Sequence, residues 1–296
     1  MDKNFLINRL EYYPFRALLA LLRFLPYRLS KAIVVWLFTT IGYGLGIRRE
    51  VAKTQLKAVY PDWDNKKLKS VLKDVYRQMA LNIVDEYIVS DEDLLYKSEI
   101  KGEEHLQAAL KEGRGVILAT AHFGNWEAAR ILPMVDIPLS VIVKKQRNTL
   151  FDDYTNMIRT RSGLRIIDMK RGLRGMMSDL KENRVVAILA DQNAGRRGLI
   201  MDFLGYPASH WKGVAKISLR YKIPIVPGFV VRNSDDTLTF DLQEMIMEPD
   251  LADEEENYVV VLEKVNQHVE RFIHEYPSQW FWVHKRWKRA HDFFER

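Results

Sequence analysis

The 296-residue chain contains no cysteine. A disulfide-bonded scaffold, a thiolate metal site and a cysteine nucleophile are therefore excluded, and a reducing compartment is compatible with the sequence. The chain also lacks internal repeats, low-complexity tracts and long linkers. It has instead 47% hydrophobic and 28% charged residues, which is typical of a folded protein and not of a disordered one. Its length allows one large domain or two small ones.

The excess of positive charge is confined to the N-terminus. The chain carries 45 Lys and Arg against 39 Asp and Glu, a formal net charge of +6. Residues 1–53 contain nine of the basic and three of the acidic residues, so residues 54–296 are neutral overall. A nucleic-acid-binding domain would spread basic residues along one of its faces, and the neutral remainder argues against that function. We therefore expect no nucleic-acid partner.

Between these charges the N-terminal segment is strongly apolar. Residues 32–47 form an uncharged run of 16 residues, bracketed by Lys31 and by Arg48 and Arg49. This is marginal for a bilayer crossing, which needs about 20 residues. Arginines interleaved with Tyr and Trp favour helices that lie in the headgroup region, which we predict for residues 1–53. Two alternatives stay open: these helices are buried in the domain, or one of them crosses the membrane. A cleaved signal peptide fits the pattern poorly.

The rest of the chain predicts an α/β domain. Apolar residues behind Asp64 recur with helical spacing and predict an amphipathic helix over 64–87. Short apolar runs then alternate with helical segments, which is typical of a mostly parallel central sheet flanked by helices. Strands are predicted at 116–120, 140–143, 164–167, 185–189 and 225–231, with an antiparallel edge strand within 237–246, and helices at 126–133, 150–161, 172–182, 211–221 and 253–275. We expect three regions: a membrane-docking segment (1–53), a helical region packed on the core (54–100) and a catalytic α/β domain (101–296).

His122 is the first candidate for catalysis. The apolar run 115–121 delivers it to the end of a strand, where α/β sheets collect their functional residues. Asn125 is a natural helix N-cap and places Glu127 in the first helical turn. Residues five apart on one helix lie about 140° from each other, so Glu127 reaches the imidazole only if the chain turns at Gly124. A His held by a carboxylate is the usual form of a general base. The alternative is structural: a polar strand end followed by an acid that caps a helix would also place His122 and Glu127 five residues apart.

The nucleophile is expected to belong to the substrate. No cysteine and no Gly-x-Ser-x-Gly elbow is present, which favours direct attack by a substrate hydroxyl. The aromatic residues of the tail are expected to pack against the domain and not to bind a ligand; these are Trp280, Phe281, Trp282 and Trp287.

The segment 121–127 resembles the His-x4-Asp/Glu motif of the glycerolipid acyltransferase superfamily and, in its fuller form, the lipid A biosynthesis acyltransferases of the lauroyl and myristoyl type. Further matches follow in the family's order along nearly the whole chain. They are the apolar N-terminus leading to 58–61, the Arg-x-Arg-Ser stretch at 159–162, the Asp-x-x-x-Gly and Phe-x-Gly-x-Pro-Ala elements at 191–195 and 203–208, and the tail 277–288. Lys144 and Gln192 depart from the pattern, because many members have Arg and some have His at these places.

The resemblance implies an O-acyltransferase that moves a fatty acyl chain from acyl carrier protein, or from coenzyme A, to a hydroxyl of a lipid A precursor. It implies a place at the cytoplasmic leaflet of the bacterial inner membrane. His122 would be the general base and Glu127 the carboxylate that orients it, with no metal and no cofactor. Two other functions stay open: acyl transfer to another membrane lipid, such as an aminolipid or a glycolipid, and a non-catalytic, membrane-anchored lipid-binding protein.

Six further residues are candidates for substrate binding. The helix N-terminus around Asn125 and Trp126, or a nearby Arg, is expected to stabilise an oxyanion. A basic cluster suits the capture of phosphate groups, although a solvated basic loop would look the same; its members are Lys144, Arg147, Arg159 and Arg161. Asp191 ends a strand and is expected to contact the substrate or to orient a site residue, with a turn-initiating Asp as the alternative.

Overall fold

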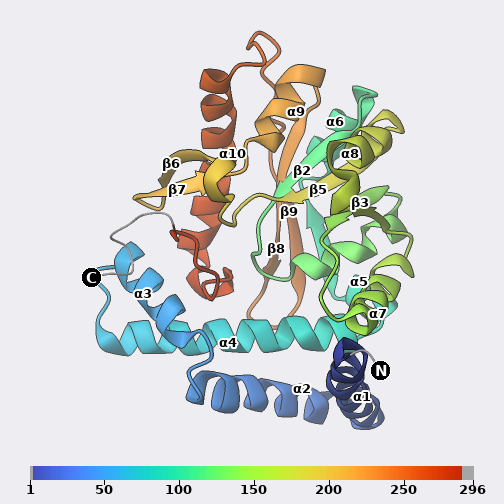
Figure 1. The fold of residues 1–296 in the computed structure, drawn as a ribbon, viewed down its shortest axis with the longest axis vertical. Coiled ribbons are helices and arrows are strands. Elements are labelled where there is room, and N and C mark those ends of the chain that lie inside the picture. Colours follow the sequence, from blue (N-terminus) through green and yellow to red (C-terminus); the bar gives the residue numbers. More distant parts are fainter. Residues whose placement is uncertain (1–2, 289–296) are drawn as a thin grey trace.

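The centre of the molecule is a seven-stranded sheet with the order β1-β9-β8-β2-β5-β3-β4 (Figure 1). The computed structural model describes residues 3–288. Neighbouring strands pair in parallel except β8 and β9, so β1 and β9 run opposite to the other strands. The strands are β1 (Ser98–Lys101), β2 (Val116–Thr120), β3 (Leu139–Val143), β4 (Arg165–Asp168), β5 (Val185–Leu189), β8 (Ile225–Arg232) and β9 (Leu238–Leu242). A separate antiparallel hairpin is formed by β6 (Leu199–Phe203) and β7 (Tyr206–His210).

The predicted, mostly parallel α/β sheet is confirmed, but the strand predicted at its edge is not the edge strand. The segment that was expected as an antiparallel edge strand, β9, does pair antiparallel with β8, but β1 pairs with its other side. The sequence does not reveal β1 because Ile100 is the one large apolar residue in this four-residue strand. The β6–β7 hairpin is likewise not predicted from the apolar pattern, although it contains the Phe-x-Gly-x-Pro-Ala element.

Helices cover both faces of the sheet because successive strand residues point to opposite sides. On one face, Ile117 and Val186 pack against α8 (Gly172–Lys181), α9 (Gly213–Tyr221) and α10 (Glu255–Glu275). On the other face, Leu118 and Ala187 pack against α6 (Glu103–Lys111) and the helix η2 (Trp126–Val135). The helix expected at 126–133 is a 3₁₀-helix and not an α-helix, and it contains Pro133.

The N-terminal helices form a base below the sheet (Figure 1). The long helix α4 (Asn65–Tyr87) runs across this end, and Asp64 caps it by accepting the N–H of Lys67, as predicted. Below α4 lie α1 (Lys3–Phe24) and α2 (Tyr27–Trp36), and a π-helical turn η1 (Leu37–Gly42) continues from α2. The remaining helices are α3 (Arg49–Val59), α5 (Asp91–Tyr96) and α7 (Thr149–Thr160), with short turns η3 (Met169–Arg171), η4 (Gly195–Arg197) and η5 (Pro277–Gln279). Among residues 3–288, no helix has the length and hydropathy required to span a bilayer.

Candidate active site

His122 lies directly beyond the carboxyl end of β2, where the chain turns at Gly124. Gly124 has a φ of +55°, and a Cβ at this position would lie 1.7 Å from the carbonyl oxygen of Val230. Its N–H donates to the carbonyl oxygen of Gln279 at 2.8 Å, and the N–H of Asn125 donates to that of Val230 at 3.1 Å. The predicted turn is therefore present, and only glycine fits it.

The imidazole of His122 is held by Asp191, which follows β5. Nδ1 of His122 lies 2.8 Å from Oδ1 of Asp191. The second carboxylate oxygen, Oδ2, accepts the backbone N–H of His122 at 3.0 Å and the indole N–H of Trp280 at 2.8 Å. Because Nδ1 donates to Asp191, Nε2 is left as a proton acceptor, which is the tautomer that a general base requires.

The environment of this pair shifts both pKa values. Burial is the largest single effect on the pKa of His122 and lowers it, but the charge and hydrogen bond of Asp191 and the charge of Glu127 together outweigh burial, so the pKa lies above its usual value. Burial raises the pKa of Asp191, but His122 and Trp280 lower it by more. Asp191 is therefore ionised at neutral pH and stabilises an imidazolium. The Asp191 side chain is 1% exposed and both of its oxygens accept hydrogen bonds, so of its two expected roles the geometry favours orienting His122 over contacting the substrate.

Glu127 was expected to hold the His122 imidazole, but its carboxylate pairs with Arg159 instead. Its carboxylate accepts two hydrogen bonds from Arg159, from Nε to Oε2 at 2.9 Å and from Nη2 to Oε1 at 2.5 Å. This is a strong bidentate pair. Asp191 already occupies Nδ1 of His122, and the turn at Gly124 directs Glu127 towards α7 instead. Glu127 acts on His122 through its charge, which adds to the rise in the His122 pKa.

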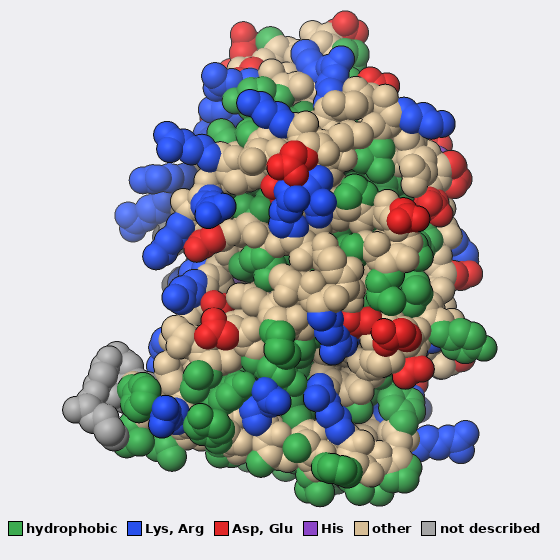
Figure 2. Space-filling model, turned by 90° about the vertical axis from the view of Figure 1, so that its right-hand side faces the viewer, with side chains coloured by type: hydrophobic (Ala, Val, Ile, Leu, Met, Phe, Trp, Pro, Cys, Tyr) green, Lys and Arg blue, Asp and Glu red, His purple; other side chains and the backbone are tan. Residues whose placement is uncertain are grey.

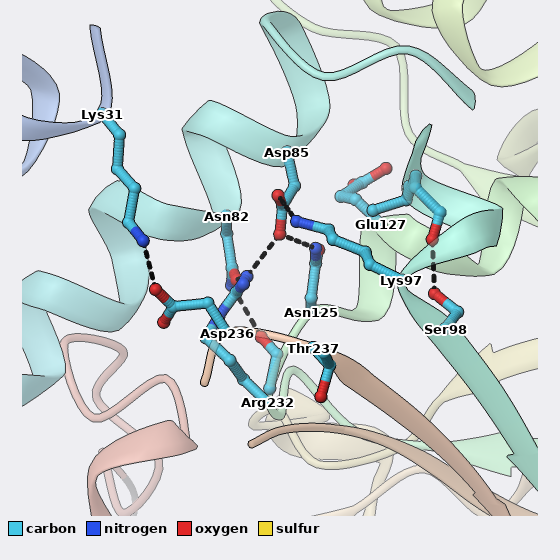
Figure 3. Close-up of polar contacts among 12 residues, drawn as sticks. Lys31, Asn82, Asp85, Lys97, Ser98, Asn125, Glu127, Arg232, Asp236 and Thr237 are labelled. Carbon is cyan, nitrogen blue, oxygen red and sulfur yellow. Dashed lines mark hydrogen bonds and ion pairs between the residues drawn. The ribbon is translucent and has the colours of Figure 1, made fainter. Parts of the chain in front are cut away.

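A buried ionic network supports the loop from behind (Figure 3). Asp85 of α4 is 1% exposed, pairs with Lys97, and accepts hydrogen bonds from Arg232 at 2.7 Å and from the side-chain amide of Asn125 at 2.9 Å. Asn125 precedes η2 but makes no side-chain cap. Its backbone N–H is also occupied by Val230. The Asn125 N–H is therefore not available to an oxyanion and the residue fixes the loop, while the role expected of the helix N-terminus at Trp126 or of a nearby Arg stays a prediction.

The C-terminal tail takes part in the site, a role that its aromatic pattern did not predict. Trp280 fixes Asp191, and the N–H of Phe281 donates to the carbonyl oxygen of His122 at 3.0 Å. Trp282 is fully buried, as expected, and its carbonyl oxygen accepts a hydrogen bond from Gln55 of α3 at 2.6 Å. The tail signature was the one sequence signal that pointed to this segment.

An apolar cavity of about 230 Å³ lies beside His122. One wall is the face of the sheet that also packs against η2, and β2, β3, β5, β8 and β9 all contribute to it. The apolar lining includes Leu118, Val141, Ala187, Leu189, Gly228, Phe240 and Leu242. The polar lining includes His122, Glu127, Lys144 and Arg159. The site therefore combines a base with a narrow apolar chamber.

The four expected cations do not form one cluster. Lys144 and Arg159 line the cavity. Arg147 is 82% exposed and pairs with a carboxylate of α1. Arg161 pairs with a carboxylate of α5 and lies outside the cavity lining. Within residues 3–288, no group of three or more His, Asp or Glu side chains is placed to bind a metal ion.

Nearly the whole chain matches a known family. A family model described as bacterial lipid A biosynthesis acyltransferase covers residues 3–289. The chain belongs to this family. It is therefore an O-acyltransferase, as the motif at 121–127 implies, and the family's activity is acyl transfer in lipid A biosynthesis.

The chain is distantly similar to several known proteins, and most of these matches cover more than four fifths of it. A lipid A biosynthesis acyltransferase of Haemophilus influenzae is 26% identical over 90% of this chain and 83% of its own length. A lipid A biosynthesis lauroyltransferase of Escherichia coli K12 is 23% identical over 84% of each chain. A phosphatidylinositol mannoside acyltransferase of Mycobacterium tuberculosis is 28% identical over 43% of this chain and 42% of its own. The crystal structure of the 1-acyl-sn-glycerophosphate acyltransferase PlsC from Thermotoga maritima covers 86% of this chain and 99% of its own at 14% identity, with a TM-score of 0.41.

Proposed function

We propose that this family member transfers a fatty acyl chain from the thioester of acyl carrier protein to a hydroxyl of a lipid A precursor, with His122 as the general base. The observation that carries the proposal is the His122–Asp191 pair beside an apolar cavity. The pair supplies a proton acceptor at Nε2 and the cavity supplies a place for an alkyl chain. Asp191 takes the orienting role that the motif alone assigned to Glu127.

The proposed reaction needs no enzyme nucleophile. Nε2 of His122 takes the proton of the acceptor hydroxyl while the hydroxyl oxygen bonds to the thioester carbonyl carbon. The C–S bond then breaks, and the leaving sulfur takes the proton from the imidazolium. The products are an ester and the free thiol of the donor. Asp191 favours the step because it stabilises the imidazolium that forms in between.

We assign the donor's acyl chain to the apolar cavity. Leu118 lies within β2, four residues before His122, and is therefore deeper along the sheet than the base. Gly228 faces Leu118 and Leu242 at this depth: a Cβ on Gly228 would lie 2.8 Å from a methyl carbon of each. All three residues line the cavity, so they are placed to limit chain length.

Gly228→Val is expected to shorten the preferred acyl chain. The added methyl groups occupy space in which the chain terminus lies, and kcat/KM for long-chain donors falls by about 10-fold or more while shorter donors are spared. Leu242→Ala is the reciprocal variant and shifts the preference towards longer chains. The measurement is a competition between donors of different length, with products resolved by mass spectrometry. An unchanged length profile in both folded variants would remove the acyl chain from this cavity.

The N-terminal helices are the proposed membrane-docking surface. Hydrophobic side chains gather at the lower end of the molecule, over α1 and α2 (Figure 2). The most exposed large apolar residues of α1, α2 and the segment that follows them are Leu10, Leu21, Phe24, Trp36, Leu45 and Ile47, at 56–89% exposure. Such a surface, with arginines between its apolar groups, fits the headgroup region of an anionic membrane. We place the protein at the cytoplasmic leaflet of the bacterial inner membrane, where a lipid acceptor and a soluble carrier meet.

The triple variant Leu10→Glu, Leu21→Glu and Phe24→Glu is expected to lose vesicle binding. Each replaced side chain forfeits part of the roughly 1.5–3 kcal/mol that burial of a large apolar group provides, so the partition coefficient falls by at least about 100-fold. Co-sedimentation with vesicles containing anionic lipid measures it. Tyr96→Glu on α5 is the control, because Tyr96 is 93% exposed but lies outside this surface. Equal binding by all three proteins would contradict the assignment.

Product analysis tests the proposed function. The purified full chain is incubated with a lipid A precursor and either acyl carrier protein thioester or acyl-coenzyme A, and the lipids are examined by mass spectrometry. We expect one additional ester-linked acyl chain on the precursor, formed faster from the carrier protein. Transfer to a mannosylated phosphatidylinositol and not to the precursor would favour the glycolipid alternative. This lipid is chosen because the mycobacterial relative is a phosphatidylinositol mannoside acyltransferase. No transfer to either lipid would favour a binding protein.

A further inference from the structure

Attack on a thioester carbonyl creates an oxyanion that needs a hydrogen-bond donor close to the base. Three N–H groups close to His122 are already committed. The N–H groups of Gly124 and Asn125 donate to backbone carbonyl oxygens. The indole N–H of Trp280 donates to the Asp191 carboxylate. The remaining candidates near the base include the indole of Trp126, whose ring centroid lies 5.3 Å from that of the imidazole, and the side-chain amide of Gln192.

Gln192 presents an amide on the catalytic side of the imidazole. It follows Asp191, and its Nε2 lies 3.2 Å from Nε2 of His122. Because Nδ1 donates to Asp191, Nε2 of His122 carries a lone pair, and the amide N–H of Gln192 donates to it. Across residues 3–288, the side chain of Gln192 makes no other hydrogen bond. An acceptor hydroxyl must bind at the same Nε2, so it displaces this amide and leaves its N–H beside the attacking oxygen.

We propose that the side-chain amide of Gln192 donates to the thioester carbonyl oxygen and stabilises the oxyanion, an inference that rests on the proposed function. As the hydroxyl oxygen bonds to the carbonyl carbon and its proton moves to His122, the carbonyl electron pair moves onto oxygen. The N–H of Gln192 holds that charge until the C–S bond breaks and the thiolate takes the proton from His122. Gln192 is then a catalytic residue whose strongest contact is made in the transition state.

Gln192→Leu tests the role because leucine is of similar size and lacks the donor. With acyl carrier protein thioester and the lipid A precursor as substrates, we expect kcat to fall by about 10²- to 10³-fold with little change in either KM. Gln192→Glu should lose a comparable factor, since it replaces the donor with a negative charge. An alkyl phosphonate mimic of the tetrahedral intermediate should bind more weakly to Gln192→Leu by a factor similar to the loss of kcat/KM. Gln107→Leu, on the exposed face of α6, is the matched control and should retain full activity.

Three results would overturn the assignment. One is a Gln192→Leu rate within about threefold of wild type. Another is a loss that comes with a shift in the acid limb of the pH profile while phosphonate binding is unchanged, because the amide would then merely hold the imidazole. A third is the same loss of kcat and phosphonate binding in Trp126→Phe, with none in Gln192→Leu, which would give the role to the indole. Failure of the proposed function is separate, because the wild-type protein would then transfer no acyl chain.

Discussion

His122→Ala is expected to lower kcat/KM for acyl transfer by about 10²- to 10⁴-fold, the contribution of a well-placed general base. Without the imidazole, the acceptor hydroxyl keeps its proton and is a weak nucleophile, and the leaving thiolate has no proton donor. Substrate binding should be retained, because the apolar cavity and the N-terminal surface are untouched. Initial rates with the acyl carrier protein thioester and the lipid A precursor measure the effect.

The control for this variant is its stability. Removal of the imidazole leaves the loop contacts of Gly124 and Asn125 intact but takes one partner from the buried Asp191 carboxylate, so the variant should stay folded with a lower unfolding temperature. A folded His122→Ala protein with near-normal turnover would refute the mechanism and leave the base unassigned.

Asp191→Asn is expected to lose a similar factor, about 10²- to 10⁴-fold in kcat, although His122 remains. The neutral amide neither stabilises the imidazolium nor enforces the tautomer with a free Nε2. Wild-type kcat/KM should fall as the pH drops through the His122 pKa, above 6.5, because a protonated imidazole cannot accept a proton. Asp191→Asn removes the charge that raises this pKa, so the fall of kcat/KM on the acid side of the pH–rate profile should begin at lower pH.

Glu127→Gln provides the comparison that separates the two carboxylates. Glu127 contributes to the His122 pKa after Asp191 and is hydrogen-bonded to Arg159. Its replacement should move the acid limb of the pH–rate profile to lower pH, but by less than Asp191→Asn does. The main loss of activity should come from the Arg159 guanidinium, which is left without its charge partner in the cavity wall. If Glu127→Gln removed the acid limb while Asp191→Asn left it unchanged, the motif's original assignment would be right and the pairing described here would be irrelevant to catalysis.

Local sequence patterns are sufficient to predict most strands of the sheet. The apolar runs at 116–120 and 185–189 are strands with those bounds, because strands buried on both faces must be continuously apolar. The same rule could not find β1, whose single apolar residue, Ile100, is no signal by itself. The helix at 126–135 was placed well, but its 3₁₀ geometry is a tertiary property that helical periodicity does not encode.

The candidate site was located from sequence but its pairing was not. His122 and the turn at Gly124 follow from a strand end and a glycine, both local features. Which carboxylate meets the imidazole depends on the order of strands in the sheet: β5 lies beside β2, so Asp191 arrives next to His122 from 69 residues away. Spacing along the chain favoured Glu127, five residues away, over a partner brought in by the fold. The contact between Trp280 and Asp191 joins residues that are still further apart along the chain, and only the tail signature pointed to it.

The ionisation of His122 tests the central claim most directly. Nuclear magnetic resonance of the full chain with labelled histidine gives the His122 pKa in the wild type, Asp191→Asn and Glu127→Gln, with His122→Ala used to assign the signal. The pairing described here predicts a wild-type pKa above 6.5, a large decrease in Asp191→Asn and a smaller one in Glu127→Gln. A pKa that is unchanged by Asp191→Asn and falls in Glu127→Gln would contradict it.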